Sequence, residues 1–557
     1  MHSEKKSTFF GGAAILMVGS ILVKLIGAVY KIPLGNILSN EAYVDFNTAY
    51  NVYNLFLTIA TAGLPVALSK TIAEANTLGR RNQVNRVFWV AFKTFLCLGL
   101  VSFAAMSIFG GPLAVAMGDD SAIYCVRALS PSVLCVCVMG AFRGYYQGHS
   151  DMMPTAVSQV IESLCKLGFG LALTFMVLAF LPGAESYRQR MAAAGAILGV
   201  SIGSVIALAY LMFCFRRTRR REKDLICADT PERDGTILKR LLELAVPITL
   251  GSAAVSIVTI IDTRVVLDLL EGMYQRLPHL ITPEAVAQAA EAGGVPPALY
   301  MAQGLKGIYD KCMAIYNLPA QLMVAFTASV IPAVSASLAR QDIREAGKTG
   351  NSAFRVAMVL ALPMGVGLFA LAGPILELLF PGKLDLAIGA PIMAVLGLAT
   401  IFVCIMSICN SILQAHGHVG IPVFTVIVGG VVKIVVNYIL VGNDAIHIKG
   451  APVGTLCCFA VVALLDMAFI HKVVPGAPSF LKALVKPLLA SAAMGAAAWG
   501  VCGLASRLVG VRLGCLVGIA AGVVVYAVLV VALKMFSKDD LALMPKGDKI
   551  AKILRIS

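Results

Sequence analysis

Charged side chains stand inside several of the long apolar runs of this 557-residue chain. Lys24 and Lys31 are seven residues apart, close to two helical turns, so both should point to one face of a helix. Later apolar runs contain four more charged candidates: Asp262, Arg264, Lys306 and Lys311. A cation in the hydrocarbon core of a membrane costs roughly 2.5–3.5 kcal/mol, so each position is a candidate for function. Because ammonium and guanidinium groups form charge-assisted bonds with phosphate oxygens, this excess of cations predicts a binding site for a diphosphate.

The same charges have structural alternatives. Lys31 and Arg264 lie near the ends of their apolar runs, where a long side chain can reach the membrane interface. Asp262 can neutralise Arg264, and Asp310 can neutralise Lys306. The sequence leaves both readings open.

The composition is that of a polytopic membrane protein. Hydrophobic residues make up 59% of the chain and charged residues 13%, and the mean hydropathy is +0.86. Each crossing of the hydrocarbon core takes roughly 20 apolar residues, and period-two alternation is absent, so helices should cross the membrane. About fourteen runs qualify: 9–29, 44–66, 87–109, 122–141, 154–181, 191–214, 241–266, 308–331, 353–373, 386–409, 421–441, 453–471, 484–505 and 513–534.

The basic residues behind the formal charge of +15 lie mainly in loops, in an arrangement that indicates membrane topology rather than nucleic-acid binding. Basic residues gather in every second loop, as in the run "RRTRRREK" at 216–223, and in the tail after residue 537. This asymmetry is typical of the positive-inside rule and predicts a cell-membrane protein with both termini in the cytoplasm. The fourteen cysteines lie mostly in apolar runs and form no pair of CxxC motifs with histidines, so no metal site is expected.

Two short polar stretches repeat across the chain. "RGYYQGHSDMMP" (143–154) aligns with "NSILQAHGHVGIP" (410–422), and the matched residues are separated by 267 positions, or 268 for the prolines. The set is Arg143, Gln147, Pro154, Lys166, Gln414, Pro422 and Lys433. Because six spans separate the copies, both should cross in the same direction, as a parallel repeat. Each stretch is expected to be a cytoplasmic turn, serving either as a plain hairpin or as a moving gate.

The repeat predicts an all-α architecture of two six-helix lobes and two C-terminal helices. The expected divisions are an N-lobe at 1–215, a basic cytoplasmic linker at 216–240, a C-lobe at 241–473, and helices 13–14 with a basic tail at 474–557. The seam between two such lobes is the natural substrate path. In the long loop at 268–304, "TPEAVAQAAEAGG" predicts a short amphipathic helix outside the membrane.

Several segments carry a family resemblance. "KLIGAVYKIPLG", "GLPVALSKTIAE", "RGYYQGHSDMMPTAVSQVIE", "PAVSASLA" and "LMPKGDKIAKILR" resemble the stage V sporulation protein B and polysaccharide-flippase family. That family belongs to the multidrug/oligosaccharidyl-lipid/polysaccharide exporter superfamily and is related to lipid II flippases. The resemblance implies fourteen helices, alternating access and export of an undecaprenyl-diphosphate-linked peptidoglycan precursor. It also implies a cationic cavity to which Lys24, Lys31 and Lys311 contribute.

The favoured hypothesis is therefore a flippase for a lipid-linked glycan, with the cations holding the diphosphate and Asn51 among the groups that bond the sugars. No GxxxxGK[ST] motif is present, so an Na⁺ or H⁺ gradient or the membrane potential is the expected energy source, with no cofactor. The alternatives are a cation-coupled multidrug exporter and a non-transporting scaffold for sporulation or division. An enzyme is disfavoured, because the acidic pair Asp119 and Asp120 lacks evident partners. We expect a monomer that works beside the cell-wall synthesis machinery.

Overall fold

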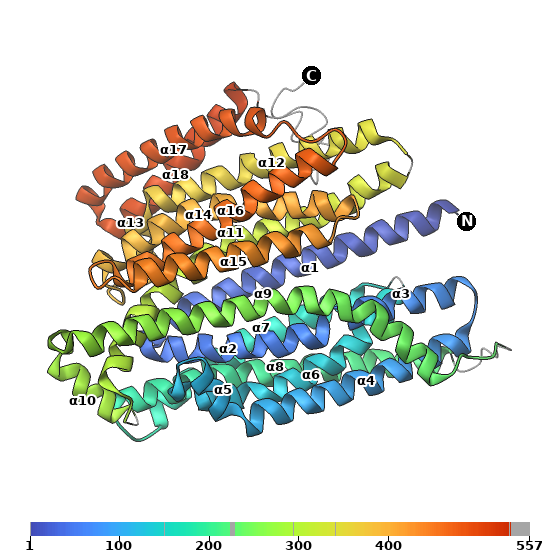
Figure 1. Cartoon of the computed structure of the whole chain (residues 1–557), viewed down its shortest axis with the longest axis horizontal. Helices are drawn as coiled ribbons and strands as arrows, with labels where there is room; N and C mark the ends of the chain where they lie inside the picture. Colours follow the sequence, from blue (N-terminus) through green and yellow to red (C-terminus); the bar gives the residue numbers. More distant parts are fainter. Residues whose placement is uncertain are drawn as a thin grey trace. The chain divides into compact units, whose positions relative to one another are not determined.

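The computed structural model describes residues 2–149, 151–222, 229–292, 294–339, 341–533 and 535. Within them the chain is helical and contains no strand (Figure 1). The α-helices are α1 (His2–Ile37), α2 (Asn40–Thr61), α3 (Leu64–Thr77), α4 (Arg81–Ile108), α5 (Gly110–Ala116), α6 (Ile123–Gly148), α7 (Met153–Phe180), α8 (Glu185–Glu222), α9 (Asp234–Arg276), α10 (Pro283–Glu291), α11 (Pro297–Ala339), α12 (Ile343–Ala370), α13 (Ala372–Leu379), α14 (Leu386–Ala415), α15 (Gly420–Val441), α16 (Ala451–Val473), α17 (Phe480–Val509) and α18 (Val511–Ala532). Three 3-10 helices complete the set: η1 (Asp120–Ala122), η2 (Pro278–Leu280) and η3 (His447–Gly450).

The predicted helical membrane architecture is confirmed. Eleven helical stretches among the described residues are long and apolar enough to cross a membrane. The other three predicted spans fall within α1, α9 and α11, which are helices of 36, 43 and 43 residues. The predicted short helix in the long loop is α10, and the Thr282 hydroxyl at its N-terminus accepts a 3.2 Å hydrogen bond from Ala285 N–H.

Packing divides the chain into two compact units, Met1–Gly307 (the N-unit) and Ile308–Ser557 (the C-unit). In the N-unit, α6 packs against α2, α3, α4 and α8, while α7 lies between α1 and α8. Helix α9, which the sequence assigned to the C-lobe, packs against α2 and α3 and therefore belongs to the N-unit by packing. The predicted N-lobe and C-lobe were divided by the sequence repeat rather than by packing, and that division stays a prediction.

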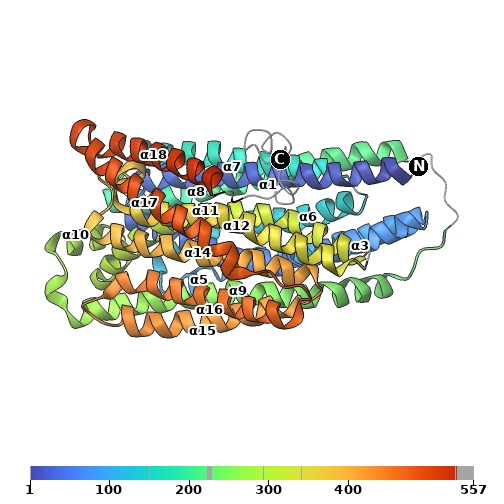
Figure 2. The same cartoon turned by 90° about the horizontal axis from the view of Figure 1, so that it is seen from above.

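In the C-unit the corresponding helices pack in the corresponding way. Helix α14 packs against α12 and α16, as α6 packs against α4 and α8. Helix α16 also packs against α15, and α17 and α18 run side by side, with α17 on α12 (Figures 1 and 2). This matching order of neighbours agrees with the predicted repeat, whose parallel direction follows from the even number of spans between the copies.

One break in a predicted span lies at a close contact between helices. Helix α2 ends at Thr61 and α3 begins at Leu64, so the predicted second span is a bent pair of helices. A Cβ on Gly63 would stand 2.1 Å from the carbonyl oxygen of Ala245 in α9, so only glycine allows this approach. The break therefore lies where the start of α3 comes close to α9.

The expectation that Arg143 and Gln147 occupy a loop is wrong. Helix α6 continues to Gly148, and only a short turn separates it from α7, where Pro154 lies in the first turn as predicted. Gly144 and Gly148 lie within α6. Their missing side chains make room for α3, because added Cβ atoms would stand 3.0 Å and 2.7 Å from side-chain atoms of that helix.

The linker after α8 is tied to the first turn of α4. The Asp229 carboxylate accepts hydrogen bonds from the N–H groups of Asn82 (3.1 Å) and Gln83 (2.9 Å), and Arg86 pairs with Asp234. Partial desolvation would raise the pKa of Asp229, but these N–H groups outweigh it, so the pKa lies below the ordinary value of 3.8. The predicted linker at 216–240 is thus shortened, because α8 reaches Glu222 and α9 begins at Asp234. The predicted basic tail beyond Met535 lies outside the described residues.

Candidate functional site

The N-unit holds a charged cluster between α6 and α7. The Arg143 guanidinium pairs with Glu162 at 3.0 Å, and its Nε donates a 3.2 Å hydrogen bond to the Ser158 hydroxyl. The Ser204 hydroxyl of α8 lies 3.3 Å from the second Glu162 oxygen. Both charged side chains are mostly buried, with exposed fractions of 15% and 21%. The pair therefore satisfies charges that would otherwise be costly at this depth.

Lys166 extends this cluster one turn along α7. It follows Glu162 by four residues, so both lie on one face of the helix. Its ammonium lies over two aromatic rings, 5.0 Å from the ring centre of Tyr30 and 4.7 Å from that of Tyr50. Tyr30 is held in turn by a 3.0 Å hydrogen bond to the carbonyl of Ala196. These contacts make Lys166 a cation enclosed by aromatic rings.

A second buried network lies where α2 and α8 begin. Arg190 donates 3.1 Å hydrogen bonds to both oxygens of Asp45 and a 2.7 Å bond to Gln303 Oε1. Gln303 Nε2 donates to Asp119 at 2.8 Å, and the Ser121 hydroxyl lies within 2.8 Å of both carboxylates. The expectation that Asp119 lacks partners is therefore wrong. The network ties α11 to the rest of the N-unit.

The structure places the predicted head-group residues on four helices: α1, α2, α9 and α11. Lys24 and Lys31 are half-buried on α1. Lys306 in the N-unit and Lys311 in the C-unit are buried on α11, with exposed fractions of 3% and 1%. Their five-residue spacing puts them about 140° apart around the helix, so they face different surroundings.

The remaining predicted site residues join α2 to α9 and α9 to α5. Asn51 donates a 3.3 Å hydrogen bond to the Thr263 hydroxyl, next to the buried Asp262. Arg264 pairs with Asp268 at 2.7 Å and donates to the carbonyl of Val115. Arg264 is thus paired with Asp268 of its own helix. A bound diphosphate would have to compete with Asp268 for this guanidinium.

The matched turns at the start of the repeat share one backbone device. His149 and His416 follow the last residues of α6 and α14, and each ring Nδ1 contacts the carbonyl four residues back, at 2.9 Å and 2.8 Å. Gln147 and Gln414 lie in the last helical turns, and Pro154 and Pro422 in the first turns of α7 and α15. Lys433 occupies the α15 position that matches Lys166. The gate role of these residues stays a prediction.

Sequence reasoning missed one charge of the C-unit. Asp466 on α16 is fully buried and accepts a 2.7 Å hydrogen bond from the Thr425 hydroxyl of α15. A lone carboxylate in the apolar run at 453–471 was the available signal. Gly199 stands at the matching position in the N-unit, so the two interiors differ in charge. Among the described residues, no three histidine, cysteine or acidic side chains are grouped to hold a metal ion.

The fold and the buried charges define a multi-pass membrane transporter of the multidrug/oligosaccharidyl-lipid/polysaccharide exporter superfamily. A family model described as polysaccharide biosynthesis protein matches residues 9–339, and a MatE model matches residues 308–439. The chain belongs to the polysaccharide biosynthesis protein family.

Similar proteins cover nearly the whole chain. Stage V sporulation protein B of Bacillus subtilis (strain 168) is 24% identical over 554 residues, which are 97% of this chain and 98% of that protein. The lipid II flippase MurJ of the same organism is 24% identical over 452 residues, covering 78% of each chain. A solved structure of lipid II flippase MurJ in an inward closed conformation aligns with a TM-score of 0.65 at 16% identity, covering 93% of this chain and 98% of the other.

Proposed function

We propose that the protein is a flippase that moves an undecaprenyl-diphosphate-linked peptidoglycan precursor, or a related lipid-linked glycan, from the inner to the outer leaflet of the cell membrane. Family membership and the similarity to a lipid II flippase support the class of substrate. The proposed mechanism is alternating access, in which the head group crosses through a polar path while the polyprenyl chain stays in lipid.

The observation that carries the proposal is the pair of lysines on α1. Lys24 and Lys31 share one face of a long apolar helix, and both are half-buried rather than submerged. Half-buried lysines in an apolar helix suit the transient binding of phosphate oxygens, because charge-assisted bonds are strong enough to hold a diphosphate and can be exchanged. Asn51, Asp262, Arg264, Lys306 and Lys311 remain proposed contacts of the head group.

The test is translocation of fluorescent lipid II by the purified protein in proteoliposomes. Lys24→Gln combined with Lys31→Gln should slow translocation by about tenfold or more, since each lost bond to a charged group is worth about 1.5–3 kcal/mol. The matched control is Lys239→Gln, which removes a cation whose side chain is 79% exposed and should have no effect.

Two outcomes would contradict the proposal. If the double variant translocates lipid II at the wild-type rate, the two lysines take no part in the mechanism. Efflux of ethidium without translocation of any lipid-linked glycan would instead identify a multidrug exporter. An undecaprenyl-diphosphate glycan without the peptide, tested in parallel, decides which glycan is carried. Collapsing the Na⁺ and H⁺ gradients separately identifies the coupling ion.

A further inference from the structure

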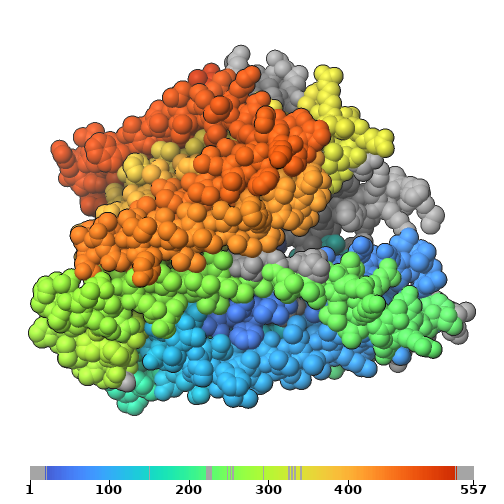
Figure 3. Space-filling model, in the orientation of Figure 1, coloured from blue at the N-terminus to red at the C-terminus, as the bar shows by residue number. Residues whose placement is uncertain are grey.

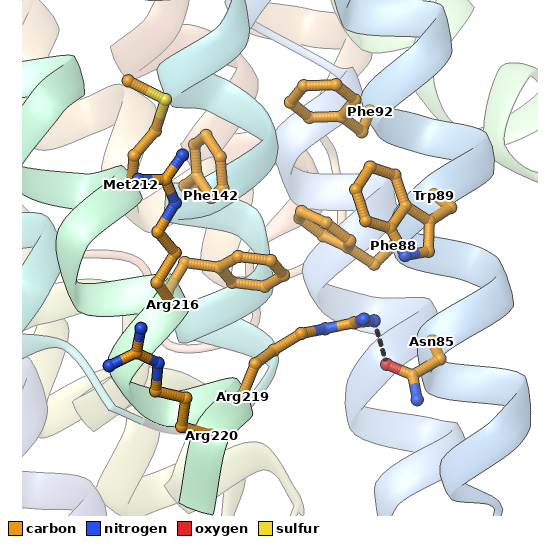
Figure 4. A pocket seen from close by; sticks show the side chains of 10 residues that line it. Asn85, Phe88, Trp89, Phe92, Phe142, Met212, Arg216, Arg219 and Arg220 are labelled. Atoms are coloured by element: carbon orange, nitrogen blue, oxygen red, sulfur yellow. Dashed lines mark hydrogen bonds between the residues drawn. The ribbon is translucent and has the colours of Figure 1, made fainter. Parts of the chain in front are cut away.

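A groove opens on the N-unit between the first half of α4 and the last turns of α8. Its cavity is about 590 Å³, within the range of small-molecule sites. Helix α6 forms the floor, because α4 and α8 both pack against it. Figure 4 shows the side chains of α4 and α8 facing each other across this space.

The walls and floor of the groove are aromatic. Phe88, Phe142 and Phe215 pack together with ring centres 4.6–5.8 Å apart, and all three are buried. Trp89 and Met212 stand above them with exposed fractions of 42% and 37%. A large apolar surface that stays exposed in a membrane helix bundle faces lipid chains.

One end of the groove is cationic. Arg216, Arg219 and Arg220 line it, and none of the described lining residues is acidic (Figure 4). Arg219 is fixed by a 2.6 Å hydrogen bond to Asn85, and its guanidinium lies 5.5 Å from the ring centre of Trp89. Arg216 and Arg220 pair with no carboxylate among the described residues, and both are exposed.

The arginines lie at the depth of the lipid head groups. The apolar part of α8 before Arg216 begins at Met191, and 25 residues of helix rise about 37 Å, slightly more than the hydrocarbon core of a bilayer. Trp89 on the facing helix suits the same level, because tryptophan is enriched at membrane interfaces. The groove therefore combines an apolar trough with a cluster of cations at the interface.

We propose that this groove binds an anionic phospholipid of the leaflet that faces the basic end of α8, with the phosphate on the arginines and an acyl chain along the aromatic floor. This ligand is distinct from the transported glycan lipid, and the described lining of the groove includes none of the predicted site lysines. Clusters of basic residues next to a membrane helix attract anionic lipids by about fivefold per cation. Three arginines therefore give a preference of about a hundredfold over a zwitterionic lipid.

The chain provides its own reporter of this site. It contains two tryptophans, Trp89 in the groove and Trp499 on α17. Full-length protein with Trp499→Phe is reconstituted into phosphatidylcholine bilayers that contain increasing fractions of brominated phosphatidylglycerol or brominated phosphatidylcholine. Bromine quenches only at contact range, so Trp89 fluorescence reports occupancy of the groove. We expect brominated phosphatidylglycerol to quench Trp89 at far lower mole fractions than brominated phosphatidylcholine.

Matched variants connect the quenching to the arginines. Replacing Arg216, Arg219 and Arg220 by glutamine should abolish the preference. Replacing only Arg216 and Arg220, which leaves the Arg219–Asn85 bond intact, should lower it by about 25-fold. Arg217→Gln removes a cation from the same helix that does not line the groove, so the preference should stay. The Trp89→Phe protein, which reports from Trp499, should show no preference.

Three results would overturn the proposal. The first is equal quenching of Trp89 by the two brominated lipids. The second is an unchanged preference in the variants that lack the arginines of the groove. The third is displacement of brominated phosphatidylglycerol by soluble glycerol phosphate alone, which would identify a site for a free anion rather than for a lipid.

Discussion

Removing the carboxylate of Asp45 should destabilise the protein more than any change at an exposed ion pair. Asp45 and Arg190 are nearly sealed from solvent, with side-chain exposures of 1% and 5%. Breaking a buried pair from one side costs about 3–5 kcal/mol, because the remaining charge stays in a low-dielectric interior. Asp45→Leu leaves the buried Arg190 charge without this carboxylate, and Arg190→Met leaves the buried Asp45 charge without its cation. Each single substitution should therefore lower the free energy of unfolding by about 3–5 kcal/mol.

The double variant separates the pair from its surroundings. Without either charge neither Asp45 nor Arg190 is left unpaired, and the loss should fall to about 1–3 kcal/mol. That remaining loss comes from Gln303 Oε1, which loses its donor Arg190, and from Asp119, which keeps its neutral donors Gln303 and Ser121 but loses the nearby cation. The coupling energy of the two residues is then at least about 3 kcal/mol, from single losses that together reach about 6–10 kcal/mol.

The assay is equilibrium unfolding of the four proteins in mixed micelles with increasing SDS, followed by circular dichroism. Lys239 and Glu243 provide the matched control, since this pair is 3.9 Å apart on one helix with exposures of 79% and 64%. Its coupling should stay below about 0.5 kcal/mol. A coupling of Asp45 with Arg190 no larger than that of the control would refute the reasoning.

Three further outcomes are expected. Glu162→Gln keeps an acceptor for Arg143 but removes the charge, so unfolding in the same assay should show a loss of about 1–3 kcal/mol; an unchanged stability would mean that Arg143 needs no carboxylate. Gly63→Val pushes a side chain into the carbonyl of Ala245 and should cost about 1–3 kcal/mol or more, whereas Gly27→Val, with no atom within 4 Å of the added Cβ, should be tolerated. The pKa of Asp229 is lower in the folded state, so its hydrogen bonds to α4 hold above the unfolded-state pKa and are lost only as the pH falls through the folded-state value. Hydrogen exchange in the first turn of α4, corrected for intrinsic rates, should therefore stay slow from pH 7 to about pH 4 and become faster below. Asp229→Asn should abolish this pH dependence.

Hydropathy was enough to find the helices, because each crossing must bury its own backbone polar groups and be apolar over roughly 20 residues. The amphipathic α10 was predictable for a similar local reason, since Thr282 and Pro283 form a start signal. The internal repeat then supplied the order of helices. These signals are contained within short windows of sequence.

Pairing of charges across the fold was not predictable in this way. Arg190 meets a carboxylate that lies 145 residues earlier in the chain, and nothing local to either residue marks the partner. The polar stretch at 143–154 was misleading, because it stands between two predicted spans and so was expected to be a turn. Arg143 was placed in a loop for that reason, whereas α6 continues to Gly148 and carries it into the interior.

The contact of His149 and His416 with the preceding helical turn has a consequence for chimeras of the two halves. His149 and His416 close the same backbone contact in both copies, so a chimera with swapped turns would keep that contact. The helices that follow differ, because Glu162 corresponds to Gly429. A chimera with swapped α7 and α15 would place the Glu162 carboxylate in a unit where Asn410 stands at the position of Arg143. The two copies of the repeat thus share the same turn contact but differ in their buried charges.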